Sequence, residues 1–365
     1  MSNTLKKTPV LQPGEGVLVT GANGYVASHI IDLLLSLGYH VRGTVRAEKP
    51  WLDEYFTTKY GTGMFESVVI PDLAQKESLI NALDGISGVL HVVCAIAFYV
   101  HTLINPSIQA TDMSHSADAE SVINNVLRIT QSILEAAAKV KTVKRVILTS
   151  SSTAVPLSKP GEEGVIIDEN SWNDKAVQLA WDDSDSSDPY KFVTVYSASK
   201  TEGERFAFTW VKEHNPHFVF NSILPNFVVG PLLSPDFSGS SGKVVLDLLQ
   251  GNSWIIPIIP PEFYINAQDA ARIHAIGLLD PDIVSQRLFA FAGTFNWTEI
   301  ISILHKLRPD NNKLPTPPEN EGRNLSVIKP AKRAEDLLKS WFDRPGWTSL
   351  EETLKDALMS VDPGK

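Results

Sequence analysis

A glycine turn near the start of the chain constrains the fold most. Residues 16–20 (GVLVT) are typical of a short buried strand, and residues 27–37 carry apolar side chains at helical spacing. In the turn between them, Gly21 permits a tight bend and Gly24 lets the backbone approach a pyrophosphate at the helix N-terminus. The unit therefore predicts a dinucleotide site. The cofactor contacts expected from it are Gly21, Asn23, Gly24, Tyr25 and Val26.

The next apolar run, residues 40–46, is expected to be the second strand, whose end meets the adenosine ribose in dinucleotide folds. An acid there suits the 2′-hydroxyl of NAD, whereas an arginine suits the 2′-phosphate of NADP. The run ends at Arg46, with Lys49 beyond it and no acid at the tip. We expect a preference for NADP(H). The alternative is an exposed strand-end charge, with Glu48 close enough to compete for Arg46.

Apolar runs at residues 65–70, 88–95, 143–148 and 217–224 predict four more strands. Unbroken apolar runs of this kind are typical of parallel sheets that are covered on both faces. The expected fold is α/β, a Rossmann-type doubly wound parallel sheet with a smaller C-terminal substrate lobe. After the third strand, Asp72 either accepts a hydrogen bond from the adenine amino group or caps the following helix.

Three divisions of the chain are expected. Residues 1–14 are expected to form a flexible tail, and residues 15–225 mainly the dinucleotide-binding domain. Residues 226–365 mix prolines, glycines and short apolar runs. This pattern is typical of a substrate lobe built from segments that leave the dinucleotide-binding domain, with some of the chain returning to the core. Residues 98–124 are polar and irregular, and they are interpreted as a loop or lid.

Composition excludes several classes of function. The formal net charge of −10 disfavours a nucleic-acid partner, and Cys94 is the only cysteine, so no intrachain disulfide can form. The most apolar stretch, residues 89–100, is too short for a membrane span, and no signal peptide is evident. We expect a cytoplasmic protein. His101, Asp112, His115 and Asp118 lack metal-ligand spacing, and no metal is expected.

Hydroxyl side chains follow the strand expected at residues 143–148. Residues 149–153 read Thr-Ser-Ser-Ser-Thr at its C-terminal end, where open α/β sheets bind their ligands. A hydroxyl there could hydrogen-bond a substrate carbonyl. The alternative is a turn whose side chains satisfy their own backbone.

Tyr196 and Lys200 lie four residues apart and share one face of a helix. A phenol with a pKa of about 10 is a weak acid at neutral pH, and an ammonium one turn away favours the phenolate and lowers that pKa. The pair is therefore a candidate proton donor to an oxygen. The spacing also arises by chance on surface helices, so the neighbouring motifs decide its meaning.

Three motifs in this order resemble the extended short-chain dehydrogenase/reductase family: the glycine turn, the strand ending in Thr-Ser-Ser, and Tyr196-x-x-x-Lys200. Residues 144–151, 196–202, 224–231 and 292–297 are similar to those of NADPH-dependent fungal aldehyde and carbonyl reductases, the branch that contains methylglyoxal and dihydroflavonol reductases. The resemblance covers the chain from about Val17 almost to its end, and residues 98–124 depart from it by their length.

The resemblance implies NADPH-dependent reduction of an aldehyde or ketone. Ser151 would polarise the carbonyl, Tyr196 would give the proton, and Lys200 would lower the pKa of Tyr196 and hold the ribose. Ser150, Ser152 and Thr153 compete with Ser151 for its role. The remaining cofactor contacts that it implies are Arg46, Lys49, Asp72, Leu73, Val93, Thr149, Pro225 and Val228. The remaining substrate contacts are Ile96, Phe98 and Phe227.

Two alternatives share this fold. A sugar-nucleotide epimerase or dehydratase with bound NAD would use the same tyrosine and lysine, although Arg46 favours NADP. A non-enzymatic dinucleotide sensor usually lacks the Tyr196–Lys200 pair. The expected partner is a small carbonyl compound rather than nucleic acid or a membrane, and the expected assembly is a monomer or a homodimer.

Overall fold

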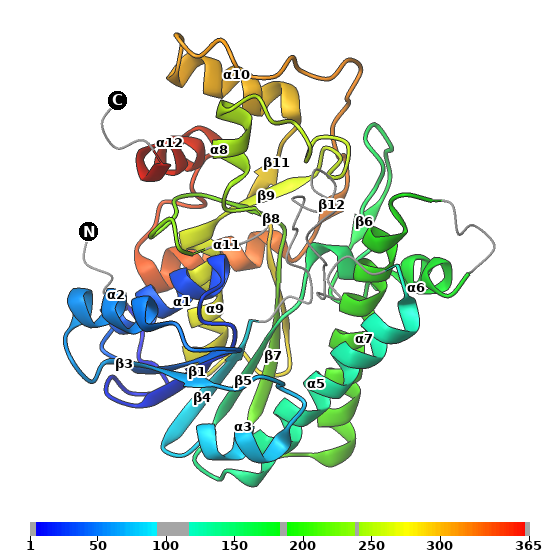
Figure 1. Ribbon diagram of the computed structural model, residues 1–365. Coiled ribbons are helices and arrows are strands. Elements are labelled where there is room, and N and C mark those ends of the chain that lie inside the picture. Colours follow the sequence, from blue (N-terminus) through cyan, green and yellow to red (C-terminus); the bar gives the residue numbers. More distant parts are fainter. Residues whose placement is uncertain (1–4, 93–116, 183–187, 238–240, 362–365) are drawn as a thin grey trace.

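The computed structural model describes residues 5–92, 117–182, 188–237 and 241–361. Its centre is a seven-stranded main sheet in which all pairings are parallel (Figure 1). In spatial order, the strands are β10 (Arg287–Ala290), β7 (Val219–Pro225), β5 (Arg145–Thr149), β4 (Ile86–His91), β1 (Gly16–Val19), β2 (His40–Val45) and β3 (Phe65–Val69). The order reverses between β1 and β4, which is where doubly wound sheets bind ligands. The predicted Rossmann-type fold is confirmed.

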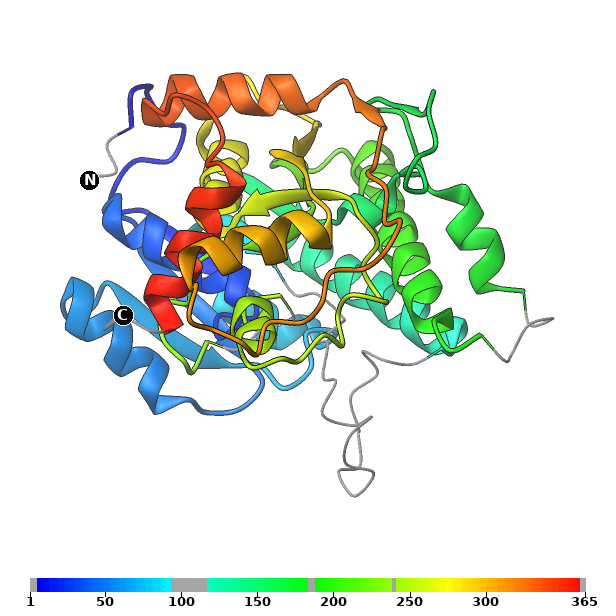
Figure 2. The ribbon, with the colours of Figure 1, turned by 90° about the horizontal axis from the view of Figure 1, so that it is seen from above.

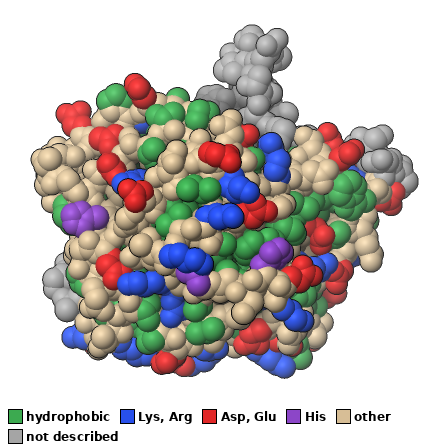
Figure 3. Space-filling view, turned by 90° about the horizontal axis from the view of Figure 1, so that it is seen from below, with side chains coloured by type: hydrophobic (Ala, Val, Ile, Leu, Met, Phe, Trp, Pro, Cys, Tyr) green, Lys and Arg blue, Asp and Glu red, His purple; other side chains and the backbone are tan. Residues whose placement is uncertain are grey.

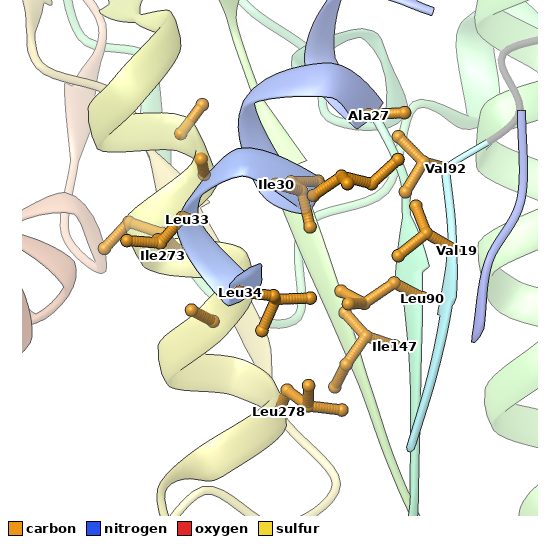
Figure 4. Packing of buried hydrophobic residues seen from close by; sticks show 14 of the residues in the cluster. Val19, Ala27, Ile30, Leu33, Leu34, Leu90, Val92, Ile147, Ile273 and Leu278 are labelled. Atoms are coloured by element: carbon orange, nitrogen blue, oxygen red, sulfur yellow. The ribbon is translucent and has the colours of Figure 1, made fainter. Parts of the chain in front are cut away.

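Helices cover both faces of the main sheet. One face packs against α1 (Tyr25–Ser36), α2 (Pro50–Tyr60), α9 (Ala267–Leu279) and α11 (Ala331–Phe342). The other face packs against α3 (Lys76–Ala82), α5 (Ala119–Lys139) and α7 (Lys191–His214). Figure 4 shows Ile30 and Leu34 of α1 directed toward Leu90 and Ile147 of the sheet. The strands that carry Leu90 and Ile147, β4 and β5, are buried on both faces, which explains their unbroken apolar runs.

A small lobe stands on the C-terminal edge of the main sheet. Its small sheet has the order β11 (Gly293–Thr294), β9 (Phe263–Asn266) and β8 (Phe227–Val229). Around it lie α8 (Val244–Leu249), α10 (Trp297–Leu307) and α12 (Leu350–Val361). Figure 2, seen from above, shows α10 to α12 gathered on one side and α5 to α7 on the other. A capping box between Ser349 and Glu352 starts α12.

Four minor elements complete the described part of the chain. They are a 3₁₀ turn η2 (Ser152–Ala154), the helix α6 (Asp174–Ala180), and the strand pair β6 (Ile166–Ile167) and β12 (Val327–Ile328).

The N-terminal segment differs from the expectation of a flexible tail at 1–14. Among its described residues, Leu11 is completely buried and belongs to the main core. Val10 N–H donates to Leu279 O at 2.9 Å, and the Tyr39 hydroxyl donates to Leu11 O at 2.7 Å. Apolar Leu11 fills space beside Gly88, where an added Cβ would lie 2.8 Å from it. The prediction was wrong for residues 5–14 because one leucine is enough to anchor a polar segment.

Several predicted boundaries also moved. β2 ends at Val45, one residue before Arg46, and β4 runs from Ile86 to His91. The helix α5 begins at Ala119, so the last part of the predicted loop at 98–124 is helical. β10 was missed because four residues carry too little periodicity to stand out.

The described residues contain no helix long and apolar enough to cross a bilayer. They also contain no cluster of three or more histidine, cysteine, aspartate or glutamate residues that could hold a metal ion. On the face seen in Figure 3, basic and acidic side chains are interspersed.

Candidate active site

The glycine turn has the geometry that its sequence predicted. Gly21 has a φ of +67°, a conformation that favours glycine, and Gly24 N–H donates to Gly21 O at 2.8 Å. A Cβ on Gly24 would lie 3.1 Å from that oxygen. Gly24 is also the N-cap of α1 and has no side chain to satisfy the first N–H groups of the helix. Those donors fit a pyrophosphate, so the turn fits a dinucleotide.

The neighbouring residues of the turn divide between surface and interior. Asn23 and Val26 are half-buried, and Tyr25 is 4% exposed; within the described part of the chain, its hydroxyl has no hydrogen-bond partner. Burial raises the pKa of Tyr25. Its ring packs against Gly242, where an added Cβ would lie 3.0 Å from the ring. A contact from Tyr25 to a phosphate would therefore come from its backbone N–H.

The adenosine end of the site lies beyond β2 and β3. Arg46 is exposed directly after β2, and Lys49 is the N-cap residue of α2. Asp72 accepts a hydrogen bond from Ala74 N–H at 2.9 Å, in a turn before α3, whose N-cap is Gln75. Asp72 therefore shapes the turn rather than capping the helix. The Leu73 side chain is buried in the core beneath this turn.

Three predicted site residues lie outside the described part of the chain. They are Val93 beside the cofactor and Ile96 and Phe98 beside the substrate.

Tyr196 and Lys200 both lie on α7, as predicted from their spacing. Lys200 is 7% exposed, and its Nζ lies 6.0 Å from the centroid of the Tyr196 ring, whereas Tyr196 is half-buried. The Nζ atom donates to Thr149 O at 3.1 Å. This bond fixes the ammonium at the C-terminal end of β5, beside the residues that follow that strand.

The hydroxyl groups after β5 have different partners. Ser150 donates to Glu204 at 2.8 Å, and Thr153 donates to Ser151 Oγ at 3.1 Å. Ser151 Oγ also accepts from Thr153 N–H at 3.2 Å, and no described residue accepts the hydroxyl proton of Ser151. Ser151 can therefore donate to a ligand oxygen, whereas Ser150 and Thr153 have their protons engaged. Ser152 is buried in η2.

Glu204 forms a buried cluster behind these residues that the sequence reasoning missed. It accepts from Ser150 and from Ser222 of β7, and both carboxylate oxygens bond Arg287 of β10, at 2.9 and 3.0 Å. Arg287 in turn stacks on Trp172, 3.9 Å from the ring centroid. The cluster ties α7 to β7, to β10 and to the residue that follows β5. Its sequence signal was the i, i+4, i+8 spacing of Tyr196, Lys200 and Glu204.

Two buried histidines flank β5. His274 Nδ1 lies 2.7 Å from Ala270 O, so Nδ1 carries the proton and Nε2 accepts from the Thr149 hydroxyl at 2.9 Å. His91 Nδ1 lies 2.9 Å from Thr20 Oγ1. Burial lowers the pKa of His274 to about 4 and, with a smaller contribution from the Lys200 charge, that of His91 to about 3. Both rings are neutral, and the Thr149 hydroxyl is engaged within the protein.

The crossover from β7 to β8 carries the remaining predicted contacts. Pro225 ends β7, and the Phe227 and Val228 side chains are buried in two different hydrophobic clusters. Between Pro225 and Phe227, Asn226 Oδ1 accepts from Phe227 N–H at 2.7 Å, while its buried Nδ2 has no hydrogen-bond partner among the described residues. An unpaired buried donor requires an explanation, and one at this sheet edge fits a carbonyl group of a bound ligand. Sequence reasoning passed over Asn226.

Comparison with known proteins decides the family. The model of the NAD dependent epimerase/dehydratase family matches residues 17–252. The chain belongs to this family. One relative is the ketoreductase adrE of Penicillium rubens, which is 40% identical over 97% of this chain and 99% of the adrE chain. Aldehyde reductase 2 of Sporidiobolus salmonicolor is 36% identical over 96% of this chain and 97% of that one.

Solved structures agree with that assignment. The yeast methylglyoxal/isovaleraldehyde reductase Gre2, complexed with NADPH, has a TM-score of 0.74 and 25% identity, covering 95% of this chain and 98% of that one. The predicted resemblance to the fungal aldehyde and carbonyl reductase branch is confirmed. A UDP-glucuronic acid 4-epimerase of Bacillus cereus, at 19% identity and a TM-score of 0.63, shares the fold.

Proposed function

We propose that this protein is an NADPH-dependent reductase of aldehydes or ketones. The observation that carries the proposal is the joint anchoring of Lys200 and Ser151 at the end of β5, with Tyr196 one turn before Lys200 on α7. Named relatives support it, since they include ketoreductases that are 40% identical to this chain and an aldehyde reductase that is 36% identical. NADPH is bound by a relative that covers nearly the whole chain.

The proposed chemistry divides among three side chains. Ser151 donates a hydrogen bond to the carbonyl oxygen and holds the carbonyl in place. Tyr196 gives the proton to that oxygen, and Lys200 stabilises the phenolate that remains and holds the ribose. The nicotinamide, when bound, supplies the hydride. The glycine turn and the uncapped start of α1 hold the pyrophosphate, and Arg46 faces the 2′-phosphate.

The proposal extends to the setting of the enzyme. It acts in the cytoplasm on a small carbonyl compound, as a monomer or a homodimer, and needs no nucleic-acid or membrane partner. We propose Pro225, Val228, Asp72, Leu73 and Lys49 as further cofactor contacts and Phe227 as a substrate contact.

The test is oxidation of NADPH, with NADH beside it, against a panel of aldehydes, diketones, β-ketoesters and bulky aromatic ketones. We expect turnover with NADPH, and we expect Tyr196→Phe to lower kcat by roughly 10²- to 10⁴-fold, because general acid catalysis contributes that much. NADPH binding, measured by fluorescence titration, should be kept. Near-normal turnover in Tyr196→Phe would overturn the proton-donor assignment. NAD that stays bound through purification would favour an epimerase.

A further inference from the structure

The Glu262 carboxyl group is a titratable group that the proposed chemistry does not use. Glu262 immediately precedes β9, and its backbone oxygen accepts from Phe295 N–H at 2.8 Å. Tyr264 of β9 pairs with Phe227 of β8. Because side chains alternate along a strand, Glu262 shares the face of the small sheet that carries Tyr264, Phe227 and Phe295.

This face begins where the chain leaves the main sheet. β7 ends at Pro225 and β8 begins at Phe227. Ser150 N–H donates to Ile223 O at 2.7 Å, which extends the parallel register of β5 and β7 and brings Ser151 level with Pro225. Glu262 therefore stands at the junction of the two sheets, on the small-lobe side of the proposed catalytic serine.

The Glu262 carboxyl group is enclosed by protein but still reachable. The residue is half-buried, and no hydrogen bond or ion pair joins its carboxyl group to another described residue. Its oxygens are not among the fully buried atoms that lack a partner, so they keep accessible surface, unlike Asn226 Nδ2. The surrounding protein desolvates the carboxylate and raises the pKa of Glu262 to about 8. At neutral pH it is therefore mainly protonated, and it can both donate and accept.

The surroundings narrow what such a group can bind. The Phe227 and Phe295 rings stack with centroids 5.2 Å apart on the same face, so they offer no competing donor or acceptor. A polar group that has no partner among the described residues and keeps accessible surface, at the junction beside the proposed catalytic serine, is a candidate for ligand recognition. A neutral carboxyl group matches a neutral hydroxyl, which can accept from it or donate to it, or a carbonyl oxygen, which can accept from it.

We propose that Glu262 is a specificity-determining residue that hydrogen-bonds a second oxygen of the substrate, a hydroxyl or a second carbonyl group. The proposal rests on the reductase function above. The hydrogen bond to Glu262 favours hydroxy ketones and dicarbonyl compounds over ketones whose substituents are purely hydrocarbon. The reacting carbonyl lies at Ser151, and the second oxygen reaches across the junction to Glu262.

The experiment compares a plain ketone with a hydroxy ketone of the same carbon skeleton. We expect Glu262→Leu to lower kcat/KM for the hydroxy ketone roughly tenfold, the usual size of one lost hydrogen bond, and to leave that of the plain ketone unchanged. Glu262→Gln, which still donates and accepts, should keep most of the preference. Glu319→Leu makes the same substitution at an exposed residue of the lobe and is the matched control.

An equal loss toward both ketones, or an unchanged ratio, overturns the proposal. So does a preference of the wild-type enzyme for the corresponding amino ketone, which would mean that Glu262 acts as a carboxylate. Calorimetric binding of both ketones to the NADPH-loaded protein gives the same ratio without turnover. Failure of every carbonyl compound to react therefore counts against the reductase function, while the binding ratio still decides the role of Glu262.

Discussion

Two glutamates inside the fold have opposite surroundings. Glu204, on α7, receives hydrogen bonds from two serines and a two-point ion pair from Arg287, and its carboxyl group is completely buried. Glu262, beside the small sheet, has no such partner among the described residues. A glutamate side chain thus holds α7 to its neighbours through hydrogen bonds and an ion pair in one place, and has no described hydrogen-bond partner in the other. A carboxyl group whose hydrogen bonds the protein satisfies holds the structure together, whereas one that keeps accessible surface and has no described partner is available to a ligand.

The largest expected effect separates the two glutamates by stability. Glu204→Leu should lower the free energy of unfolding by about 3–5 kcal/mol, because it leaves the Arg287 charge buried without a partner. Glu262→Leu should change the free energy of unfolding little, because no hydrogen bond or ion pair to a described residue is lost. Urea denaturation of both variants measures the difference.

A double variant sharpens this test. Leucine at both 204 and 287 removes the charge pair together and should recover part of the stability lost in Glu204→Leu. If the two single variants at 204 and 262 lost equal stability, the contrast between the glutamates would not hold.

The second effect divides the adjacent serines in the same way. Ser151→Ala should lower kcat by roughly 10²-fold, the usual scale for removing one donor to a reacting oxygen, with little change in stability. Ser150→Ala should instead lower the unfolding free energy by about 1–3 kcal/mol, because the Glu204 carboxylate loses a donor. Steady-state kinetics and thermal unfolding of the same two proteins give both readings. If Ser150→Ala instead lowered kcat and Ser151→Ala lowered the stability, the catalytic role would belong to Ser150.

The last test is a pH dependence that belongs to Glu262. Its pKa is raised from 4.5 to about 8 in the fold by desolvation, so the folded protein holds a proton that the unfolded chain releases. Stability from this group is present below 4.5 and is lost as the pH rises through 8, by at most about 1.4 kcal/mol per pH unit. Relative to wild type, Glu262→Gln should therefore gain in melting temperature as the pH rises across that window. A constant difference between the two proteins would contradict the raised pKa.

The sequence predicted those features that have a local cause. The glycine turn, the central strands and the shared helix of Tyr196 and Lys200 follow from spacing and apolar runs, which one short window contains. The partners of Glu204 come from residues 18 to 83 positions away along the chain. No local pattern announces such pairings, and the same holds for His274 beside Thr149.

Absence of a partner is still harder to predict than its presence. Glu262 and Asn226 stand out because no described residue pairs with the Glu262 carboxyl group or with Asn226 Nδ2, and only the folded arrangement of the chain reveals this. Leu11 shows the converse, since its burial depends on Gly88 and α9, both distant in sequence. The roles of Ser151, Tyr196 and Lys200 in catalysis stay predictions until the variants are measured.

The position of β10 at the edge of the main sheet bears on how the chain is made. This strand is translated long after α7, yet it supplies the arginine that neutralises Glu204. On the ribosome, α7 therefore emerges before the arginine that pairs with its Glu204, and β10 itself is made before β11, α10 and α12 of the small lobe. The ion pair that ties α7 to the edge of the main sheet can form only once β10 has been synthesised.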